Sequence, residues 1–206
     1  MGKVDKNKEQ KEKSLLKTAF EFFTTKGFSK TSISDIVNKA GVAKGTFYLY
    51  FKDKYDIRNR LVSHKSSQLF RNAVSEIESE TENISFEDKI LKIIDNIINQ
   101  LNENKSLLTF ISKNLSWGVF KSALTSPPSD EDINFADIYY KMLEEAPYEF
   151  TDPEIMLFMI IELVSSTCYS AILYSEPCTL SELKPHLYDT IRIIVERHKQ
   201  KSKEHF

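Results

Sequence analysis

The sequence contains few cysteines, and its glycines and prolines are unevenly placed. Only Cys168 and Cys178 are present, with no histidine cluster nearby, so we expect neither a disulfide framework nor a metal site. Four of the five glycines precede residue 46, all six prolines follow residue 126, and no β-hairpin dipeptide occurs. These absences predict an all-α chain.

Signals for export, membrane insertion and catalysis are also lacking. Residues 1–14 are polar throughout, which argues against a signal peptide there. The one segment long enough to span a membrane, Ile155 to Tyr174, has no Lys or Arg close to either end, so we expect it not to do so. No nucleophile elbow, phosphate loop or paired-carboxylate motif appears. The sequence therefore favours a cytoplasmic protein that is not an enzyme and uses no cofactor.

Charge is distributed asymmetrically along the chain. Residues 1–60 contain 14 Lys or Arg and 7 Asp or Glu, whereas the remainder contains 14 and 23. A basic amino-terminal part on an acidic body indicates that a polyanionic partner meets the amino-terminal part. The alternative for the lysines of residues 3–13 alone is a solvated tail.

Residues 31–54, TSISDIVNKAGVAKGTFYLYFKDK, read as two short helices joined by a turn. The first has apolar residues at helical spacing, namely Ile33, Ile36, Val37 and Ala40. Gly41 predicts a left-handed C-cap, after which Val42 packs back on the helix. The second helix runs from about Lys44 to Tyr50, with Phe47 and Phe51 on its inner side. This is a helix-turn-helix, whose second helix lies in a DNA major groove.

Capping signals mark where these helices begin. Ser32 followed by Asp35 resembles a capping box, so Ser32 is the expected N-cap. Asp53 followed by Asp56 repeats the pattern, so another helix should begin near Lys54.

At these residues the sequence resembles the amino-terminal domain of the TetR family of bacterial transcriptional regulators. The matching residues are Gly27-Phe28, Thr31-Ser32-Ile33, Ile36, Ala40-Gly41-Val42, Gly45-Thr46-Phe47-Tyr48, Tyr50-Phe51 and Lys54. The resemblance implies a three-helix DNA-binding head, residues 1–53, and a helical effector-binding and dimerisation body, residues 54–206, with about nine helices in total. The chain departs from the family at Ala43, where Ser or Thr often caps the recognition helix; losing such a cap costs about 1 kcal/mol.

The candidate DNA-binding residues follow from helical spacing and from the family resemblance. By helical spacing, Ser34 lies opposite the apolar stripe of the first short helix, and Gly45, Thr46, Tyr48 and Leu49 point away from Phe47. The resemblance implies that Lys44, Thr46 and Tyr48 contact bases or adjacent phosphates. It also implies that Ser32, Tyr50 and Lys54 clamp the DNA backbone. The alternative is that Tyr48 and Tyr50 are half-buried aromatic residues of the head.

Apolar periodicity predicts the remaining helices. The first should run from about Glu9 to Lys26, with residues 1–8 outside it, and a long helix from about Lys54 to Ser79 should join head to body. The head core is expected to contain Phe20, Phe23, Phe28, Ile36, Val42, Phe47 and Phe51. Body helices are expected at about 86–101, 105–124, 131–145 and 153–174, with a loop at 125–130; a last helix begins either at the Thr179/Glu182 capping box or at Pro185.

The helix expected at 153–174 is apolar on nearly all sides, so it should be buried on both faces. One face can belong to the chain's own core, and the other then needs a partner. The resemblance implies that the last two helices form a homodimer interface, a four-helix bundle related by twofold symmetry.

An effector cavity in the body is the second expected site, since helical bodies hold small molecules in apolar pockets with a few polar groups. The candidates are Trp117, Phe120, Tyr139, Tyr140, Met159, Glu162, Cys168 and Tyr169, although any one of them can equally be ordinary core. A carboxylate in an apolar helix must be paired, neutralised or exposed to water. Glu162 therefore either meets a cationic effector or bonds a Tyr or an Arg such as Arg192.

The interpretation is a homodimeric transcriptional regulator, a repressor, that binds a palindromic operator in double-stranded DNA and is released by a small hydrophobic or aromatic effector. Two alternatives remain at this point. One is a helix-turn-helix activator or architectural protein without an effector; the other is a helical enzyme with a fortuitous helix-turn-helix.

Overall fold

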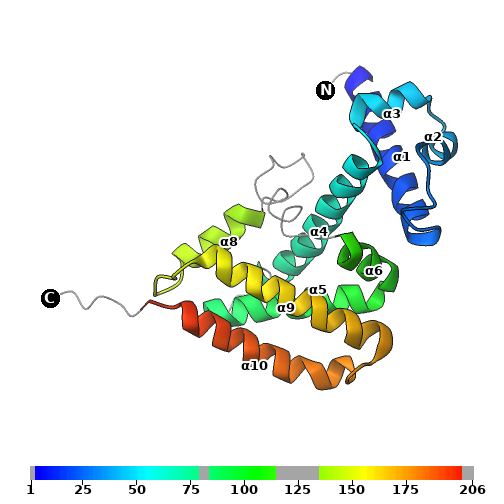
Figure 1. The fold of residues 1–206 in the computed structure, drawn as a ribbon. Coiled ribbons are helices and arrows are strands. Elements are labelled where there is room, and N and C mark those ends of the chain that lie inside the picture. The colour runs from blue at the N-terminus through cyan, green and yellow to red at the C-terminus, as the bar shows by residue number, and fades with distance from the viewer. Residues whose placement is uncertain (1–2, 79–83, 115–134, 201–206) are drawn as a thin grey trace.

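The computed structural model describes residues 3–78, 84–114 and 135–200, and within these ranges the chain forms nine α-helices and no strand (Figure 1). This confirms the predicted all-α class. One long and two short helices form a head, and the others form a body that is reached through a further long helix.

The head consists of α1 (Lys3–Thr25), α2 (Ile33–Ala40) and α3 (Lys44–Tyr50). The bounds of α2 and α3 agree with the prediction. In contrast, α1 begins at Lys3 and not near residue 9, so residues 3–8 are helical. The prediction followed apolar periodicity, which starts only at Leu15. The preceding turns are rich in Lys, Glu and Gln, which favour helix without contributing to a core.

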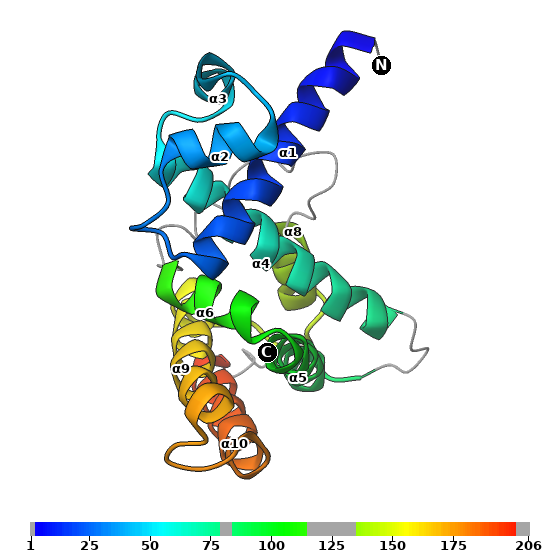
Figure 2. The ribbon, with the colours of Figure 1, turned by 90° about the vertical axis from the view of Figure 1, so that its right-hand side faces the viewer.

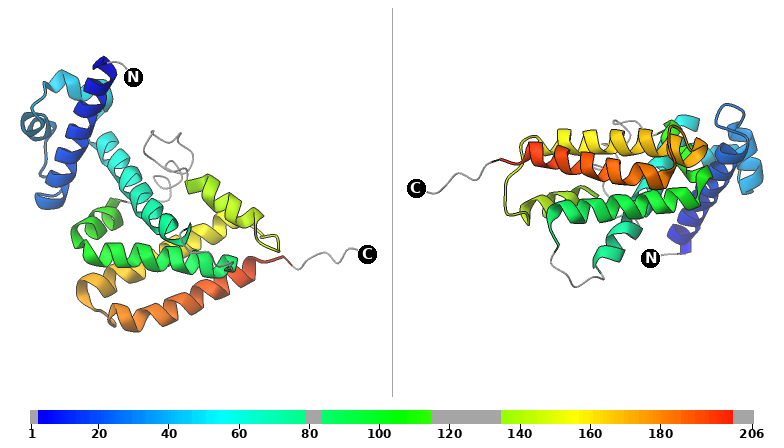
Figure 3. Two further views of the ribbon diagram at one scale, coloured as in Figure 1. Left: turned by 180° about the vertical axis from the view of Figure 1, so that it is seen from behind. Right: turned by 90° about the horizontal axis from the view of Figure 1, so that it is seen from below.

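The body consists of α4 (Lys54–Glu78), α5 (Phe86–Glu103), α6 (Lys105–Asn114), α8 (Phe135–Glu144), α9 (Pro153–Tyr174) and α10 (Leu180–His198). Helix α4 runs from the head into the body, and α9 and α10 lie side by side along the edge far from the head (Figures 1 and 3). The last helix begins at its Thr179/Glu182 capping box, so Pro185 lies inside it.

Two parts of the prediction fall outside the described residues. The helix expected to continue to residue 124 is described as far as Asn114, and residues 115–134 contain Trp117, Phe120 and the expected loop. The helix expected from residue 131 is described from Phe135.

Two hydrophobic clusters hold the molecule together. Four of the seven predicted head-core residues are buried, namely Phe23, Ile36, Phe47 and Phe51, and the other three pack against them. The same cluster includes residues of α4 and α6. The ring of Phe110 on α6 meets the rings of Phe20 and Phe23 at centroid distances of 5.3 Å and 6.3 Å. The second cluster fills the body between α4, α5, α8, α9 and α10. Helix α6 therefore joins head to body.

Helix α9 is only partly covered by its own chain. It is the one helix in the described part that is long and apolar enough to span a membrane by length and composition, and 33% of its most apolar window is buried. Met156, Ile160 and Cys168 face the body core. Ile155, Phe158 and Met159 are exposed. Part of the apolar surface of α9 is therefore exposed in the described part of the structure.

Candidate nucleic-acid interface

The start of α2 is fixed by a reciprocal capping box. The Ser32 hydroxyl accepts a hydrogen bond from the Asp35 backbone N–H at 3.1 Å, and the Asp35 carboxylate accepts one from the Ser32 N–H at 2.8 Å. These bonds, from the Ser32 side chain first and its backbone second, lower the pKa of Asp35. The predicted cap is confirmed, and it holds Ser32 at the exposed start of the helix-turn-helix.

The turn between α2 and α3 depends on Gly41. Its φ of 69° lies in the left-handed region, and no atom lies within 4 Å of where a Cβ would stand, so backbone conformation and not space selects glycine. The Val42 N–H then donates to the Val37 carbonyl at 3.0 Å. Ala43 caps α3 without a side-chain hydrogen bond, as its residue type predicts.

Helix α3 has one buried and one exposed side. Phe47 is fully buried, and its ring meets Phe51 at a centroid distance of 5.4 Å. On the opposite side, Tyr48 is 53% exposed and Leu49 is 81% exposed. The surface formed by these side chains and their neighbours is called the recognition surface below; it comprises Ser34, Lys44, Gly45, Thr46, Tyr48 and Leu49.

Leu49 is a residue that the search for polar DNA contacts did not select. An apolar side chain at the centre of an exposed helix face contributes nothing to the head core. Apolar side chains contact the methyl group of thymine in the major groove. Its spacing away from Phe47 is visible in the sequence, but an apolar residue type gives no signal for a polar DNA contact.

Two of the three expected backbone clamps, Tyr50 and Lys54, are engaged within the head. The Tyr50 hydroxyl donates to the Lys8 carbonyl at 3.1 Å, and the ring packs on the head core, which fits the half-buried alternative for this tyrosine. The Lys54 ammonium donates to the carbonyls of Phe28 and Thr31 at 2.9 Å and 2.8 Å. It also lies 4.4 Å from the centre of the Phe28 ring. Lys54 thus ties α4 to the loop before α2.

We expect Lys54→Met to lower the free energy of unfolding by about 2 kcal/mol, because two half-buried carbonyl oxygens lose a charged donor. Urea denaturation of the full chain measures this. Lys52→Met is the matched control, since Lys52 is exposed in the adjacent turn and only its backbone N–H is bonded, to Asp56. Equal stability of the two variants would show that the loop does not depend on the ammonium.

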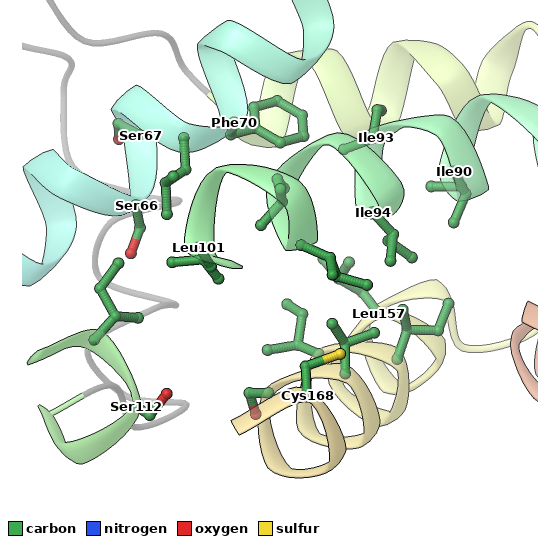
Figure 4. Close-up of a pocket in the computed structure, with 18 of the residues that line it drawn as sticks. Ser66, Ser67, Phe70, Ile90, Ile93, Ile94, Leu101, Ser112, Leu157 and Cys168 are labelled. Carbon is green, nitrogen blue, oxygen red and sulfur yellow. The ribbon is translucent and has the colours of Figure 1, made fainter. Parts of the chain in front are cut away.

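The body contains a cavity of about 180 Å³ between α4, α5, α6, α8 and α9 (Figure 4). Its lining is almost entirely aliphatic, and none of the described residues around it carries a charge. They are Ser66, Ser67, Leu69, Phe70, Ile90, Ile93, Ile94, Ile97, Ile98, Leu101, Leu108, Ile111, Ser112, Tyr139, Met142, Leu157, Ile160, Ile161, Val164, Ser165 and Cys168. An apolar cavity of this size admits an uncharged organic molecule.

Two of the eight effector candidates line this cavity. Tyr139 donates its hydroxyl to the Pro153 carbonyl at 2.8 Å, and burial raises its pKa. Burial also raises the pKa of the Cys168 thiol to about 11, so that thiol is neutral at physiological pH. Trp117 and Phe120 lie outside the described residues.

The remaining four candidates are not among the lining residues. Tyr140, Met159 and Glu162 are exposed, and Tyr169 packs at the edge of the body core. Arg192, named above as a possible partner of Glu162, instead forms an ion pair with Asp88 at 3.1 Å. Glu162 has the third environment open to a carboxylate in an apolar helix, which is exposure to water.

The cavity also contains a polar atom that the sequence analysis missed. The Ser66 hydroxyl of α4 is buried and has no hydrogen-bond partner among the residues that the structure describes. In Figure 4 it lies with Ser112 at the end of the cavity formed by α4 and α6. The only signal in the sequence is that α4 becomes polar in its middle, where an apolar residue would be expected to face the body.

Comparison with known proteins places these sites in context. Residues 15–61 match the family model described as bacterial regulatory proteins, tetR family. The HTH-type transcriptional regulator YvdT of Bacillus subtilis is 46% identical over 63 residues, which are 29% of this chain and 32% of YvdT. The fatty acid metabolism regulator protein of B. subtilis is 36% identical over 72 residues, 35% of this chain and 37% of that protein. The chain spans less than half the length of the curated relatives it matches.

Solved structures extend the likeness to the whole fold. A tetR family transcription regulator from Shewanella sp. PV-4 superposes with a TM-score of 0.65 at 15% identity, covering 93% of this chain and 99% of that one. FadR from B. subtilis, solved with stearoyl-CoA, gives a TM-score of 0.62 at 20% identity and covers 88% and 96%. At these identities the superpositions establish the shared fold.

Proposed function

We propose, from the premise that residues 15–61 belong to the TetR family of bacterial regulatory proteins, that the whole chain is a dimeric, effector-controlled transcriptional repressor. The observation that carries this proposal is the recognition surface. Helix α3, of seven residues, buries Phe47 completely and exposes Tyr48 and Leu49 to solvent. The exposed side chains are therefore placed to contact another molecule and not the head core. A recognition helix with this geometry enters a major groove.

The charge of the head supports duplex DNA as the partner. The excess of Lys and Arg lies in residues 1–60, the part of the chain that includes α3. Positive charge supplies the sequence-independent share of DNA affinity, and contacts to base edges supply specificity. Lys44, Thr46, Tyr48 and Leu49 are exposed or half-buried on α3 and can provide these base and phosphate contacts.

A dimer would place two such heads on one operator. The apolar side chains exposed on α9 and α10 are Ile155, Phe158, Met159, Tyr174 and Ile193. These two helices are adjacent at the edge of the body far from the recognition surface (Figure 1). Packing them against a second copy forms a four-helix interface with twofold symmetry, which matches the symmetry of a palindromic site.

The aliphatic cavity would hold the effector. Its size suits a small uncharged molecule, since a cavity of about 150 Å³ accommodates benzene. The buried Ser66 hydroxyl offers such a molecule one hydrogen bond. The stearoyl-CoA in the B. subtilis FadR structure also carries an apolar chain, which supports an apolar effector here.

The position of the cavity suggests how an effector would control DNA binding. The lining includes residues of α4 and α6, the two body helices that contact α1. We consider two arrangements of α4 and α6, each with its own position of the head. An effector that fits only one of them raises the population of that arrangement, and its differential affinity for the two sets the size of the shift. The repressor leaves the operator when the favoured arrangement holds the two heads at a separation that does not match the operator half-sites.

The alternatives receive less support. The relatives and structural neighbours named above are transcription regulators and not enzymes. As such proteins act on chromosomal DNA, we place this chain in the cytoplasm. The apolar cavity and its hydroxyl, which has no partner among the described residues, favour a protein with an effector over a DNA-binding protein without one.

Selection of bound duplexes from a random pool tests the proposal directly. We expect a consensus with twofold symmetry and half-sites about one helical turn apart. An enrichment with no symmetric consensus would contradict the proposed dimeric repressor, and retention of random duplexes without preference would contradict sequence-specific regulation.

Ser66→Ala should raise the free energy of unfolding of the ligand-free chain by about 1 kcal/mol, because it removes a buried hydroxyl that has no partner. Ser67→Ala, at the next position of the same cavity wall, is the control and should change little.

The same pair of variants tests the polar anchor with phenol and benzene as probes. Thermal shifts should show that the unmodified chain prefers phenol by about fivefold in affinity, since one hydrogen bond contributes about 1 kcal/mol. Ser66→Ala should lose that preference and Ser67→Ala should keep it. A preference that survives in Ser66→Ala would assign the anchor to another group.

A further inference from the structure

A second hollow lies between the head and the body, separate from the aliphatic cavity. It is a groove of about 620 Å³, with one wall from the end of α1 and the loop that follows and the other wall from α6. The residues lining it are Phe23, Thr24, Lys26, Gly27, Phe28, Ser29, Lys30, Lys105, Ser106, Thr109, Phe110 and Lys113. Its volume is in the range of small-molecule binding sites.

The charges of this groove have one sign. Its head wall contributes Lys26 and Lys30, its α6 wall contributes Lys105 and Lys113, and its lining contains no carboxylate. No ion pair joins these four ammonium groups to a carboxylate within the described ranges. Some lysines elsewhere in the described ranges do form ion pairs, as Lys13 does with Glu9 and Lys39 with Glu21. The groove therefore brings four positive charges together without a carboxylate in its lining, although Lys26 also interacts electrostatically with Asp35 of α2.

The two walls of the groove differ in their distance from α3: the head wall leads along the chain to Ser32 at the start of α2, whereas the α6 wall lies away from α3. The end of α3 meets α1 at Lys8, through the Tyr50 hydroxyl, whereas the groove begins near Phe23. At 1.5 Å per residue these positions are separated by roughly 22 Å along α1. Figures 1 and 2 show α6 at the end of α1 away from α3. A duplex docked on α3 therefore does not account for Lys105 and Lys113 of the α6 wall.

We propose that this groove binds a small, multiply phosphorylated molecule of the nucleoside di- or triphosphate class. Lysine ammonium groups are compact donors that suit phosphate oxygens, and four of them match the charge of a triphosphate. Ser29 and Ser106 are exposed at the groove and add hydroxyl donors, one from each wall. The rings of Phe28 and Phe110 provide an apolar wall for the remainder of the molecule.

Such a ligand joins the two parts of the molecule. Without an anion, the lysines of the head wall and those of α6 repel one another across the groove. A polyphosphate bound to both pairs removes this repulsion and holds the α1 end against α6. A ligand in the groove thus affects the position of the head separately from an effector in the aliphatic cavity.

Isothermal titration calorimetry on the full chain tests the proposal at constant ionic strength, with ATP, inorganic tripolyphosphate and sulfate as probes. We expect ATP and tripolyphosphate to bind at one site per chain and sulfate to bind at least tenfold more weakly. Tighter binding of ATP than of tripolyphosphate identifies a nucleotide as the ligand, and equal binding identifies the phosphate chain alone. Equal affinity for sulfate, or no binding of either polyphosphate, overturns the proposal.

Variants locate the site. The double variant Lys30→Gln/Lys105→Gln should weaken polyphosphate binding at least tenfold, because it removes one ammonium from each wall. The double variant Lys52→Gln/Lys141→Gln removes the same charge from exposed positions outside the groove and should bind normally. Equal weakening in both overturns the assignment to the groove.

The calorimetry requires no DNA, so its outcome is independent of the proposed repressor function. The other source of phosphate for these lysines is the backbone of the operator DNA. Operator titrations of the same variants, in the absence of nucleotide, test this alternative. An operator affinity of Lys30→Gln/Lys105→Gln equal to that of the unmodified chain supports a small-molecule site. A smaller salt dependence in Lys30→Gln/Lys105→Gln alone would assign these lysines to the DNA backbone and overturn the proposal.

Discussion

Ile193→Glu is expected to separate the proposed dimer into monomers and to weaken binding to a full operator at least 100-fold. Ile193 is 63% exposed on α10, next to the exposed apolar side chains of α9. Twofold symmetry places the substitution twice in one interface, so the dimer would have to bury two unpaired carboxylates. Each lost isoleucine also removes about 1.5–3 kcal/mol of apolar burial.

The loss of operator affinity follows from the loss of linkage between the heads. When one head of a dimer is bound, the second binds at an effective concentration set by the body, which raises overall affinity by about 10²–10⁴. A monomer retains only the affinity of one head for one half-site. Ile193→Glu should therefore bind a full operator no more tightly than an isolated half-site.

Sedimentation equilibrium and gel-shift titrations with full and half operators measure both effects. Tyr140→Glu is the matched control, because Tyr140 is 50% exposed but lies on α8, outside the proposed interface. It introduces the same charge and should leave dimerisation unchanged. A dimeric Ile193→Glu with intact operator affinity would contradict an interface on α10.

The helix-turn-helix of the head could be predicted from sequence almost to the residue because its determinants are local. The capping box of Ser32 and Asp35, the left-handed Gly41 and the four-residue spacing of Phe47 and Phe51 each involve groups within a few positions of one another. Interactions of such short range leave a direct pattern in the sequence. The same is true of Thr179 and Glu182 at the start of α10.

Contacts between distant segments left no comparable pattern. Phe110 was recognised as an apolar residue of a body helix, but only the fold shows that its ring meets Phe20 and Phe23 of the head. Lys54 was expected to contact phosphate, whereas its ammonium binds carbonyls 23 and 26 residues away in the chain. The domain boundary between residues 53 and 54 stays a prediction. The hydrophobic cluster of the head also includes residues of α4 and α6.

The cavity that we propose as the effector site was harder still to predict. The candidates were chosen as aromatic and polar residues, and only Tyr139 and Cys168 of the described ones line the cavity. Its walls are mostly isoleucine and leucine, which sequence reasoning assigns to the core. Whether an aliphatic side chain faces a neighbour or an empty space depends on how five helices pack, and hydrophobic periodicity does not encode that.

Phe47→Ala and Tyr48→Ala should separate the folding of the head from DNA recognition, although the two residues are adjacent. Phe47 is fully buried against Phe51, so its truncation should lower the free energy of unfolding by about 3–5 kcal/mol. A typical domain has only about 5–15 kcal/mol in total. The head of Phe47→Ala should therefore lose its helices well before the body, and operator binding should disappear with them.

Tyr48→Ala should do the reverse. The Tyr48 side chain is 53% exposed, so its removal should change stability by less than about 0.5 kcal/mol. It should nevertheless weaken operator binding by about 10- to 100-fold, because a base or phosphate contact worth about 1–3 kcal/mol is lost. Urea denaturation followed by circular dichroism and gel-shift titration report the two quantities separately. Phe47→Leu is the control that restores an apolar side chain and should recover both. If Tyr48→Ala kept full affinity, the exposed face of α3 would not be the surface that reads DNA.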